Sequence, residues 1–351
     1  MVSIYDIAKA VGMSAATVSR ALAENDKISR ASRERIQRIA EEMGYRPNLL
    51  ARNFRQKSSS MIGLITDDVS DELTGMIAKG VEQALSENGF SMLVRNVHHD
   101  SDNEQSAIHY FADMQMDGVI LADSTLDALA EVPATKLPFV LINRYSSAEE
   151  PVSIVCTDDF AGGFDATEYL IKLNHRKIAY INGPENWYSS IRRLNGYTDA
   201  LKQNDIPYRT AYVKHGDWFE ESGYRLALEL FRSEDPPTAV FASNDMMAIG
   251  VIDAAKACGL RVPEDVSVMG YDDRTIARYA RPKLTTISLP MFEVGLMAGR
   301  MLCEMIATGQ IADGKSERLL VRGNVIERET TAPLQGAAGE TMPDSGRDTN
   351  Q

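Results

Sequence analysis

Residues 4–22 read IYDIAKAVGMSAATVSRAL, and the apolar side chains of this stretch recur at helical spacing on both sides of Gly12. Ser14 stands where it can N-cap the second of the two helices, which should span residues 15–22. The outer face of this second helix carries small and hydroxyl-bearing side chains with one arginine, Arg20. Such a face is slim enough to enter the major groove of DNA and can contact phosphates and base edges. The stretch therefore predicts a helix-turn-helix unit.

The distribution of charge indicates a basic N-terminal module on an acidic body. Residues 1–57 contain eleven Lys and Arg against six Asp and Glu, a balance of +5, whereas the whole chain of 351 residues carries a net charge of -13. Apolar spacing predicts a third helix within residues 28–43, and a brief segment, 48–55, precedes the linker-like residues 57–60. A basic module of this kind attracts polyanions such as DNA.

The overall composition excludes several classes of protein. Hydrophobic residues at 44 % and charged residues at 25 % are ordinary globular values, which excludes disordered, collagenous and disulfide-framework proteins. Cys156, Cys258 and Cys303 lie far apart in apolar runs, so we expect small buried side chains in a reducing compartment. No apolar run reaches the ~18 to 20 residues of a membrane span, and the N-terminus lacks the features of a signal peptide. We therefore expect a soluble protein of the cytoplasm with no membrane partner.

From residue 61 onward the pattern changes to apolar strands that alternate with helical stretches. Strands this apolar are typical of a parallel sheet covered on both faces, so we predict an α/β body of doubly wound sheets. About ten strands over ~270 residues favour two sheets rather than one. Residues 336–351 almost lack large apolar side chains and are predicted to be disordered. The predicted strands are 62–66, 91–95, 118–122, 139–143, 177–181, 239–242, 267–270 and 318–321.

Residues 4–14 and 17–22, followed by Gly44-Tyr45-Arg46-Pro47-Asn48 and Ala51-Arg52, resemble the headpiece of the LacI/GalR family of bacterial transcription regulators. The resemblance covers residues 2 to about 332. It implies an all-α helix-turn-helix headpiece joined to two doubly wound subdomains similar to periplasmic sugar-binding proteins. The implied boundaries are 1–47 for the headpiece, 48–60 for a hinge helix and linker, and 61–332 for the effector-binding domain. Within that domain, the N-subdomain would comprise about 61–157 and 290–322, and the C-subdomain about 158–289 and 323–332.

The resemblance also implies which residues contact DNA. Ala15 and Ala16 would face base edges, and because alanines offer only apolar contact, Arg20 would carry most of the hydrogen-bonded readout. Phe54 occupies the position of the apolar wedge that the hinge helix inserts into the minor groove; the alternative is that Phe54 packs against the body. The full set of expected DNA contacts is Tyr5, Ser14, Ala15, Ala16, Thr17, Ser19, Arg20, Asn25, Asn48, Ala51, Arg52 and Phe54.

In the body, the segments 175–181, 193–197, 242–250, 262–266 and 270–273 are similar to the family's sensor domain. They follow predicted strands, and ligands of open α/β sheets bind outside the carboxyl ends of the strands. Charged side chains there can hold hydroxyl groups, and the indole of Trp218 can stack on a sugar. Each of these residues taken alone could instead be a surface ion pair or a core aromatic. The effector contacts implied are Leu73, Asn143, Arg193, Trp218, Asn244, Asp245 and Asp272.

Two departures from the family pattern bear on the ligand. Where the family often has Asn-Pro-Phe-Phe after the first sensor strand, this chain has Asp71-Glu72-Leu73-Thr74, preceded by Asp67 and Asp68. These acids disfavour a phosphorylated or carboxylate effector, because like charges repel. Asn174 also replaces the customary Gly before His175, which affects only that turn.

We therefore expect a homodimeric, allosteric repressor of carbohydrate-utilisation genes that binds a pseudo-palindromic operator and is controlled by a neutral sugar. The alternatives are a purine, nucleoside or phosphosugar effector, or a protein corepressor. We expect no catalytic residue, no cofactor and no metal. A sugar-modifying enzyme would need an activated nucleophile or an acid/base pair, and none is recognisable. A transport-type binding protein would need a signal peptide.

Two motifs point to other chemistry and are discounted. Residues 309–316, GQIADGKS, satisfy the P-loop pattern, but the motif requires a strand before it and a helix after it. Here a helical stretch precedes it and a predicted strand follows. His98-His99-Asp100 could suggest a metal, but no further His or Cys lies at ligand spacing, so a solvated loop is expected.

Overall fold

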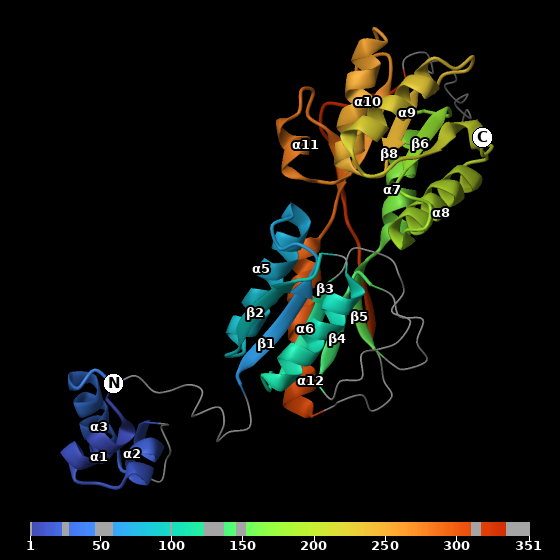
Figure 1. The fold of residues 1–351 in the computed structure, drawn as a ribbon. Coiled ribbons are helices and arrows are strands. Elements are labelled where there is room, and N and C mark those ends of the chain that lie inside the picture. Colours follow the sequence, from blue (N-terminus) through green and yellow to red (C-terminus); the bar gives the residue numbers. More distant parts are fainter. Residues whose placement is uncertain are drawn as a thin grey trace, which may run out of the picture. The chain divides into compact units, whose positions relative to one another are not determined.

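The computed structural model describes residues 2–22, 28–45, 59–98, 100–122, 137–144, 152–309 and 317–334. The chain divides into two compact units, Met1–Ser59 and Ser60–Gln351 (Figure 1). Among the described residues, no helix is both long and apolar enough to cross a membrane. Some predictions lie outside the described residues: those for Asn25, Asn48, Ala51, Arg52, Phe54, most of 309–316, and 336–351.

Within its described residues, the first unit contains three helices, α1 (Ile4–Val11), α2 (Ala15–Leu22) and α3 (Arg30–Glu42). A capping box between Ser3 and Asp6 starts α1, and Gly12 ends it with a left-handed φ of 68°, which glycine adopts without strain. The backbone N–H of Thr17 donates to Ser14 Oγ at 3.1 Å, so Ser14 caps α2 as predicted. Apolar side chains from all three helices form one core. The helix-turn-helix prediction is confirmed.

The second unit contains two six-stranded sheets, and the first of them is parallel throughout. Helices α5 (Glu72–Glu87) and α12 (Met291–Thr308) cover one face of this first sheet, and α6 (Ser101–Asp113) covers the other. Its strand order is β11-β5-β4-β3-β1-β2. Its strands are β1 (Met61–Thr66), β2 (Ser91–Asn96), β3 (Gly118–Ala122), β4 (Phe139–Ile142), β5 (Ser153–Thr157) and β11 (Arg318–Val321).

The second sheet is parallel except for β12, which runs antiparallel to β10 at the edge. Helices α9 (Glu220–Phe231) and α10 (Asp245–Ala257) cover one face, and α7 (Asp159–Lys172) and α8 (Tyr188–Gln203) cover the other. Its order is β12-β10-β9-β8-β6-β7. Its strands are β6 (Ile178–Asn182), β7 (Val213–His215), β8 (Ala239–Ala242), β9 (Ser267–Asp272), β10 (Thr285–Ser288) and β12 (Val325–Ile326). A short 3-10 helix (Thr210–Tyr212) precedes β7, and α11 (Thr275–Tyr279) follows β9.

The chain crosses between the two sheets three times: from β5 to α7, from β10 to α12, and from β11 to β12 (Figure 1). We call the part around the first sheet the N-subdomain and the part around the second sheet the C-subdomain. Both sheets are doubly wound, as predicted. Asn174 adopts a φ of 68°, a left-handed conformation that Asn tolerates, so its replacement of the family's Gly leaves the turn intact.

Candidate functional site

The predicted DNA-contact surface of the headpiece is partly exposed. Tyr5 is 74 % exposed, and Ser14, Ala16 and Arg20 are exposed as well. The hydroxyls of Ser14 and Thr17 lie 2.8 Å apart, and Arg20 Nε donates to the carbonyl of Ala16 at 3.2 Å, which leaves the terminal guanidinium nitrogens for another acceptor. This surface offers hydroxyls and one cation, the groups that contact phosphates and base edges.

The remaining predicted contacts on α2 are less open. Ala15 is half-buried and packs against the headpiece core, and Thr17 and Ser19 are half-buried too. Of the two alanines, Ala16 is therefore the one whose methyl group is freer to reach a base edge.

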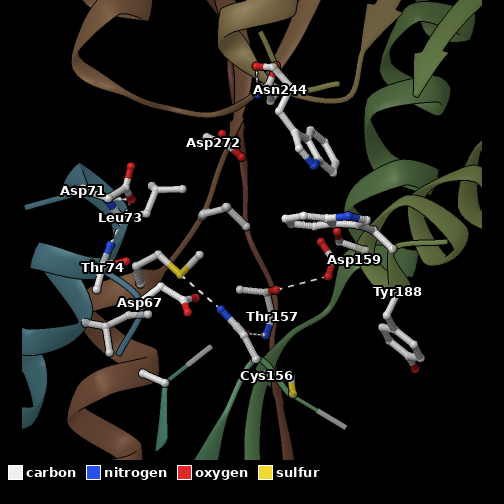
Figure 2. Close-up of a pocket in the computed structure, with 18 of the residues that line it drawn as sticks. Asp67, Asp71, Leu73, Thr74, Cys156, Thr157, Asp159, Tyr188, Asn244 and Asp272 are labelled. Atoms are coloured by element: carbon white, nitrogen blue, oxygen red, sulfur yellow. Dashed lines mark hydrogen bonds between the residues drawn. The ribbon is translucent and has the colours of Figure 1, made fainter. Parts of the chain in front are cut away.

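A cavity of about 310 Å³ lies in the second unit, between the N-subdomain and the C-subdomain. Figure 2 shows side chains of α5, including Asp71 and Thr74, facing Asp159 and Tyr188 across it. Its lining comes from the carboxyl ends of strands in both sheets, where ligands of open α/β folds bind. Six of the seven predicted effector residues line it: Leu73, Asn143, Arg193, Trp218, Asn244 and Asp272. The structure adds further lining residues that the sequence did not indicate, among them Thr157, Asp159, Trp187, Tyr188 and Arg274.

Arg193 is the central cation of this cavity, and it is only 6 % exposed. Its Nε donates to Asp159 Oδ1 at 2.8 Å and its Nη1 to the carbonyl of Ser243 at 2.5 Å. Its guanidinium carbon lies 3.8 Å from the ring centre of Tyr271. Burial disfavours the charged form of Arg193, but nearby carboxylates, Asp159 first among them, outweigh burial and hold its pKa above the usual value. Arg193 therefore stays charged and fixed in place.

Asp272 faces Arg193 from the end of β9 and has an unusual backbone, with a φ of 116°. Its Oδ1 lies 4.0 Å from Arg193 Nη1, and its Oδ2 accepts a hydrogen bond from Arg274 Nε at 3.2 Å. Burial raises the pKa of Asp272 to about 6 although both arginines oppose the shift. A ligand hydroxyl that donates to this carboxylate would stabilise its charged form.

Asp245 differs from the other predicted effector residues, because it is fully buried and does not line the cavity. Its carboxylate accepts from Thr286 Oγ1 at 2.6 Å and from the backbone N–H of Arg274 at 2.7 Å. Burial, together with the charge of Asp272, raises its pKa well above the usual value. The expectation of a direct contact between Asp245 and a ligand hydroxyl is corrected: this side chain fixes the backbone at Arg274.

Two tryptophans form an aromatic wall. The rings of Trp187 and Trp218 lie 5.6 Å apart at 62°, in an edge-to-face arrangement. Trp218 has a φ of 75°, and its backbone carbonyl accepts from Asn244 Nδ2 at 2.9 Å. Asn244 also caps α10 through its Oδ1. Trp218 Nε1 is buried and has no hydrogen-bond acceptor among the described residues, so the indole offers a ligand mainly its apolar ring face.

The N-subdomain wall is acidic and carries few free donors. Asp67, Asp68 and Asp71 lie at the end of β1 and the start of α5, and Asp71 Oδ1 caps α5 by accepting from the N–H groups of Leu73 and Thr74. Asn143 Oδ1 accepts from the N–H of Thr157 at 3.0 Å, with a φ of 53° at Asn143.

Three other features of the described residues bear on chemistry: metal-ligand side chains, the cysteines and the P-loop-like stretch. No group of three or more His, Cys, Asp or Glu there is arranged to hold a metal ion. Cys156 and Cys303 are buried and Cys258 is half-buried. In the P-loop-like stretch, Gly309 caps the end of α12 with a φ of 67°, so a helix precedes that stretch, as expected.

A helix-turn-helix unit on a two-sheet body with a pocket at the strand ends defines a class of ligand-responsive DNA-binding proteins. Residues 3–48 match the description "Bacterial regulatory proteins, lacI family", and residues 167–331 match "Periplasmic binding protein-like domain". The chain is 34 % identical over 327 residues to the HTH-type transcriptional repressor CytR of Escherichia coli K12, covering 92 % of this chain and 96 % of that one. It is 33 % identical over 334 residues to the HTH-type transcriptional regulator CelR of Thermobifida fusca, covering 92 % and 96 %. The chain belongs to the lacI family of bacterial regulatory proteins.

Solved structures confirm the fold. The lac repressor dimer bound to operator and the anti-inducer ONPF matches with a TM-score of 0.82 at 26 % identity, over 94 % of this chain and 99 % of that chain. The complex of the transcriptional regulator CelR with cellobiose matches with a TM-score of 0.68 at 30 % identity, over 94 % and 100 %. Both CytR and CelR are HTH-type transcriptional regulators.

Proposed function

We propose that the protein is a cytoplasmic repressor of carbohydrate-utilisation genes whose affinity for operator DNA is controlled by a neutral sugar. The observation that carries this proposal is the cavity in which a buried Arg193, two carboxylates and an aromatic wall converge. Charge-assisted hydrogen bonds around an apolar ring face are what a polyhydroxylated ring requires. At about 310 Å³ the cavity lies at the lower end of the ~300 to 1,000 Å³ of ligand pockets, which suits a small sugar.

The charges around the cavity favour a neutral ligand over an anionic one. The lining contains five aspartates and two arginines, Arg193 and Arg274. Both arginines are already paired, Arg193 with Asp159 at 2.8 Å and Arg274 with Asp71 at 3.0 Å. A phosphate would have to compete with these carboxylates for the guanidinium groups and would face the remaining acids.

Within this proposal, the residues have distinct roles. Trp218 stacks under the ring, while Arg193 and Asp272 bind its hydroxyls from the C-subdomain, and Asn143 and Leu73 contact it from the N-subdomain. Asp245 acts only by holding the backbone at Arg274. On the headpiece, the face of α2 with Arg20 contacts the operator.

A purine or nucleoside is the second candidate, and the two indoles are the observation that favours it. Because Trp187 and Trp218 meet edge to face, a flat base could stack on one indole and contact the other, as well as a sugar face could. The acceptor-rich lining would suit the amino groups of a base. The two candidates differ in what their binding requires, because a base needs both rings and a sugar mainly the stacking face of one.

We also propose that the protein acts as a homodimer. Phe219 is 69 % exposed and lines an open hollow at the start of α9 with Tyr224, Met246 and two glutamates, Glu220 and Glu221. Tyr279 on α11 is 73 % exposed. Exposed aromatic side chains of this size mark association surfaces. In sedimentation experiments the parent should be a dimer, and the double variant Phe219→Ser/Tyr224→Ser should shift toward monomer. If the double variant remains a dimer, this surface is not the dimer interface.

The effector proposal is tested by intrinsic fluorescence, because the chain has two tryptophans and both line the cavity. Neutral sugars, sugar phosphates, uronic acids and nucleosides are titrated while the emission is recorded. A neutral sugar should change the emission at saturable concentrations, and Trp218→Ala should weaken its binding, measured by calorimetry, by at least tenfold. Tyr208→Ala is the matched control, since this exposed ring does not line the cavity. Binding of only a nucleoside or an anion would overturn the proposal of a neutral sugar.

A further inference from the structure

The N-terminus of α5 and the loop after β9 come from different subdomains, and they meet at one rim of the cavity. Arg274 Nη1 donates to Asp71 Oδ2 at 3.0 Å. Next to this pair, the backbone N–H of Thr275 donates to the Glu72 carboxylate at 2.9 and 3.2 Å, and Thr275 Oγ1 donates to Glu72 Oε1 at 2.5 Å. We call these four residues, Asp71, Glu72, Arg274 and Thr275, the clasp. Its inner pair lines the cavity and its outer pair is exposed.

Both halves of the clasp are held in place within their own subdomains. Asp71 uses its other oxygen, Oδ1, to cap α5, so its carboxylate is oriented by two backbone N–H groups. On the other side, Asp272 binds Arg274 Nε at 3.2 Å, and Asp245 binds the Arg274 backbone N–H at 2.7 Å. Exposed ion pairs usually contribute little because two long side chains must be ordered. Here that ordering is largely complete before the two halves meet, so less entropy is lost on contact.

We propose that the clasp holds the cleft closed when no effector is bound, so that the effector stabilises a closed form that is already populated. This inference rests on the proposed function only for its regulatory meaning, since the closure itself requires no ligand. A ligand gains apparent affinity in proportion to the fraction of the protein already in its binding-competent state. The clasp would then influence effector affinity even though its outer pair, Glu72 and Thr275, does not touch the effector.

The test measures closure in the effector-free full-length protein. Donor and acceptor dyes are placed at Lys79→Cys on α5 and Lys256→Cys on α10, both exposed positions, in a Cys258→Ala background. Labelled chains are diluted into excess unlabelled protein so that energy transfer occurs within one chain. The outer pair of the clasp is removed by the double substitution Glu72→Ala/Thr275→Val, which we call the clasp variant. It leaves every cavity-lining residue in place. The matched control is Glu87→Ala, because Glu87 on the same helix pairs with Arg300 at 3.3 Å inside the N-subdomain.

If the clasp holds the cleft closed, most molecules of the parent and of Glu87→Ala should show high energy transfer between the dyes. The clasp variant should show about a fivefold lower ratio of high- to low-transfer molecules, because the hydrogen bonds from Thr275 to the Glu72 carboxylate are lost. Rising salt should shift both the parent and the clasp variant toward low transfer, because both keep the ion pair between Arg274 and Asp71. Thr275→Val alone should give an intermediate distribution, and an unchanged urea midpoint would show that each variant is folded.

Identical transfer distributions in the parent and the clasp variant, or a parent that is open without ligand, would overturn the inference. Both outcomes are independent of the sugar proposal, because no effector is present. Conversely, a screen in which no sugar binds would contradict the proposed effector and leave the measured closure unaffected.

Discussion

Arg193→Met should destabilise the second unit strongly, because it removes one partner from a buried ion pair. Arg193 and Asp159 are 6 % and 8 % exposed, and their charged atoms lie 2.8 Å apart. With methionine at position 193, the Asp159 carboxylate keeps only the Thr157 hydroxyl at 3.3 Å, and the Ser243 carbonyl loses its guanidinium donor. Breaking a buried pair in this way costs about 3 to 5 kcal/mol of unfolding free energy.

The assay is urea unfolding followed by tryptophan emission, which reports on the second unit alone because both tryptophans lie in it. Arg300→Met is the matched control, since its pair with Glu87 is exposed and its loss should cost less than about 1 kcal/mol. The double variant Arg193→Met/Asp159→Leu should regain part of the loss, because no isolated charge then remains buried.

A loss below about 1 kcal/mol for Arg193→Met, equal to that of the control, would refute the claim that Arg193 is held as a buried and paired cation. The expected loss of unfolding free energy also complicates effector-binding experiments on Arg193 variants. Failure of an Arg193 variant to bind effector would combine lost contacts with lost stability, so Trp218→Ala is the cleaner probe of the cavity.

Three further predictions concern packing, pH and DNA. Gly80→Ala should lower the unfolding free energy by about 1 to 3 kcal/mol, because the added Cβ would lie 2.1 Å from a carbonyl oxygen of α12. Gly75→Ala in the same helix has room for its Cβ and should be neutral or stabilising in the same urea assay. The pKa of Asp272 is about 6 in the folded protein against an ordinary 3.8, so the folded form binds more protons than the unfolded form between these pH values. The stability of the parent relative to Asp272→Asn should therefore fall by up to about 3 kcal/mol as the pH rises from 4 to 6. A pH-independent difference would contradict this. Arg20→Ala should weaken operator binding by about 1 to 3 kcal/mol in anisotropy titrations and relax sequence preference, and an unchanged preference would exclude Arg20 from base readout.

Much of the fold could be predicted because local patterns and tertiary packing agree. All eight predicted strands exist, from β1 to β11, since buried parallel strands are continuous apolar runs. The strands that were not predicted have weaker signals for identifiable reasons. β10 reads TTIS and is rich in hydroxyls, β7 has three residues, β12 has two, and the three apolar residues of β5 (SIVCT) stand between hydroxyl-bearing ones.

The site was predictable only where a residue directly follows a predicted strand or lies in a family motif. Asp159 was missed because it follows β5, which the sequence did not indicate. Trp187 and Arg274 were missed because their roles depend on partners far along the chain, Trp218 and Asp71. Asp245 lies beside the true lining residue Asn244, yet the first turn of α10 directs it to Thr286 instead of the cavity, a difference that spacing alone does not reveal.

The central claim is that a ligand in the cavity controls binding of DNA by the headpiece, and one titration tests it most directly. A labelled duplex chosen by in vitro selection with the full-length protein is bound, and its anisotropy is followed with and without the sugar that changes the tryptophan emission. The account predicts that saturating sugar changes operator affinity by at least about tenfold, equivalent to about 1.4 kcal/mol of coupling, and that Trp218→Ala abolishes the change at the same sugar concentration. An operator affinity that is identical with and without a saturating, cavity-bound ligand would contradict it.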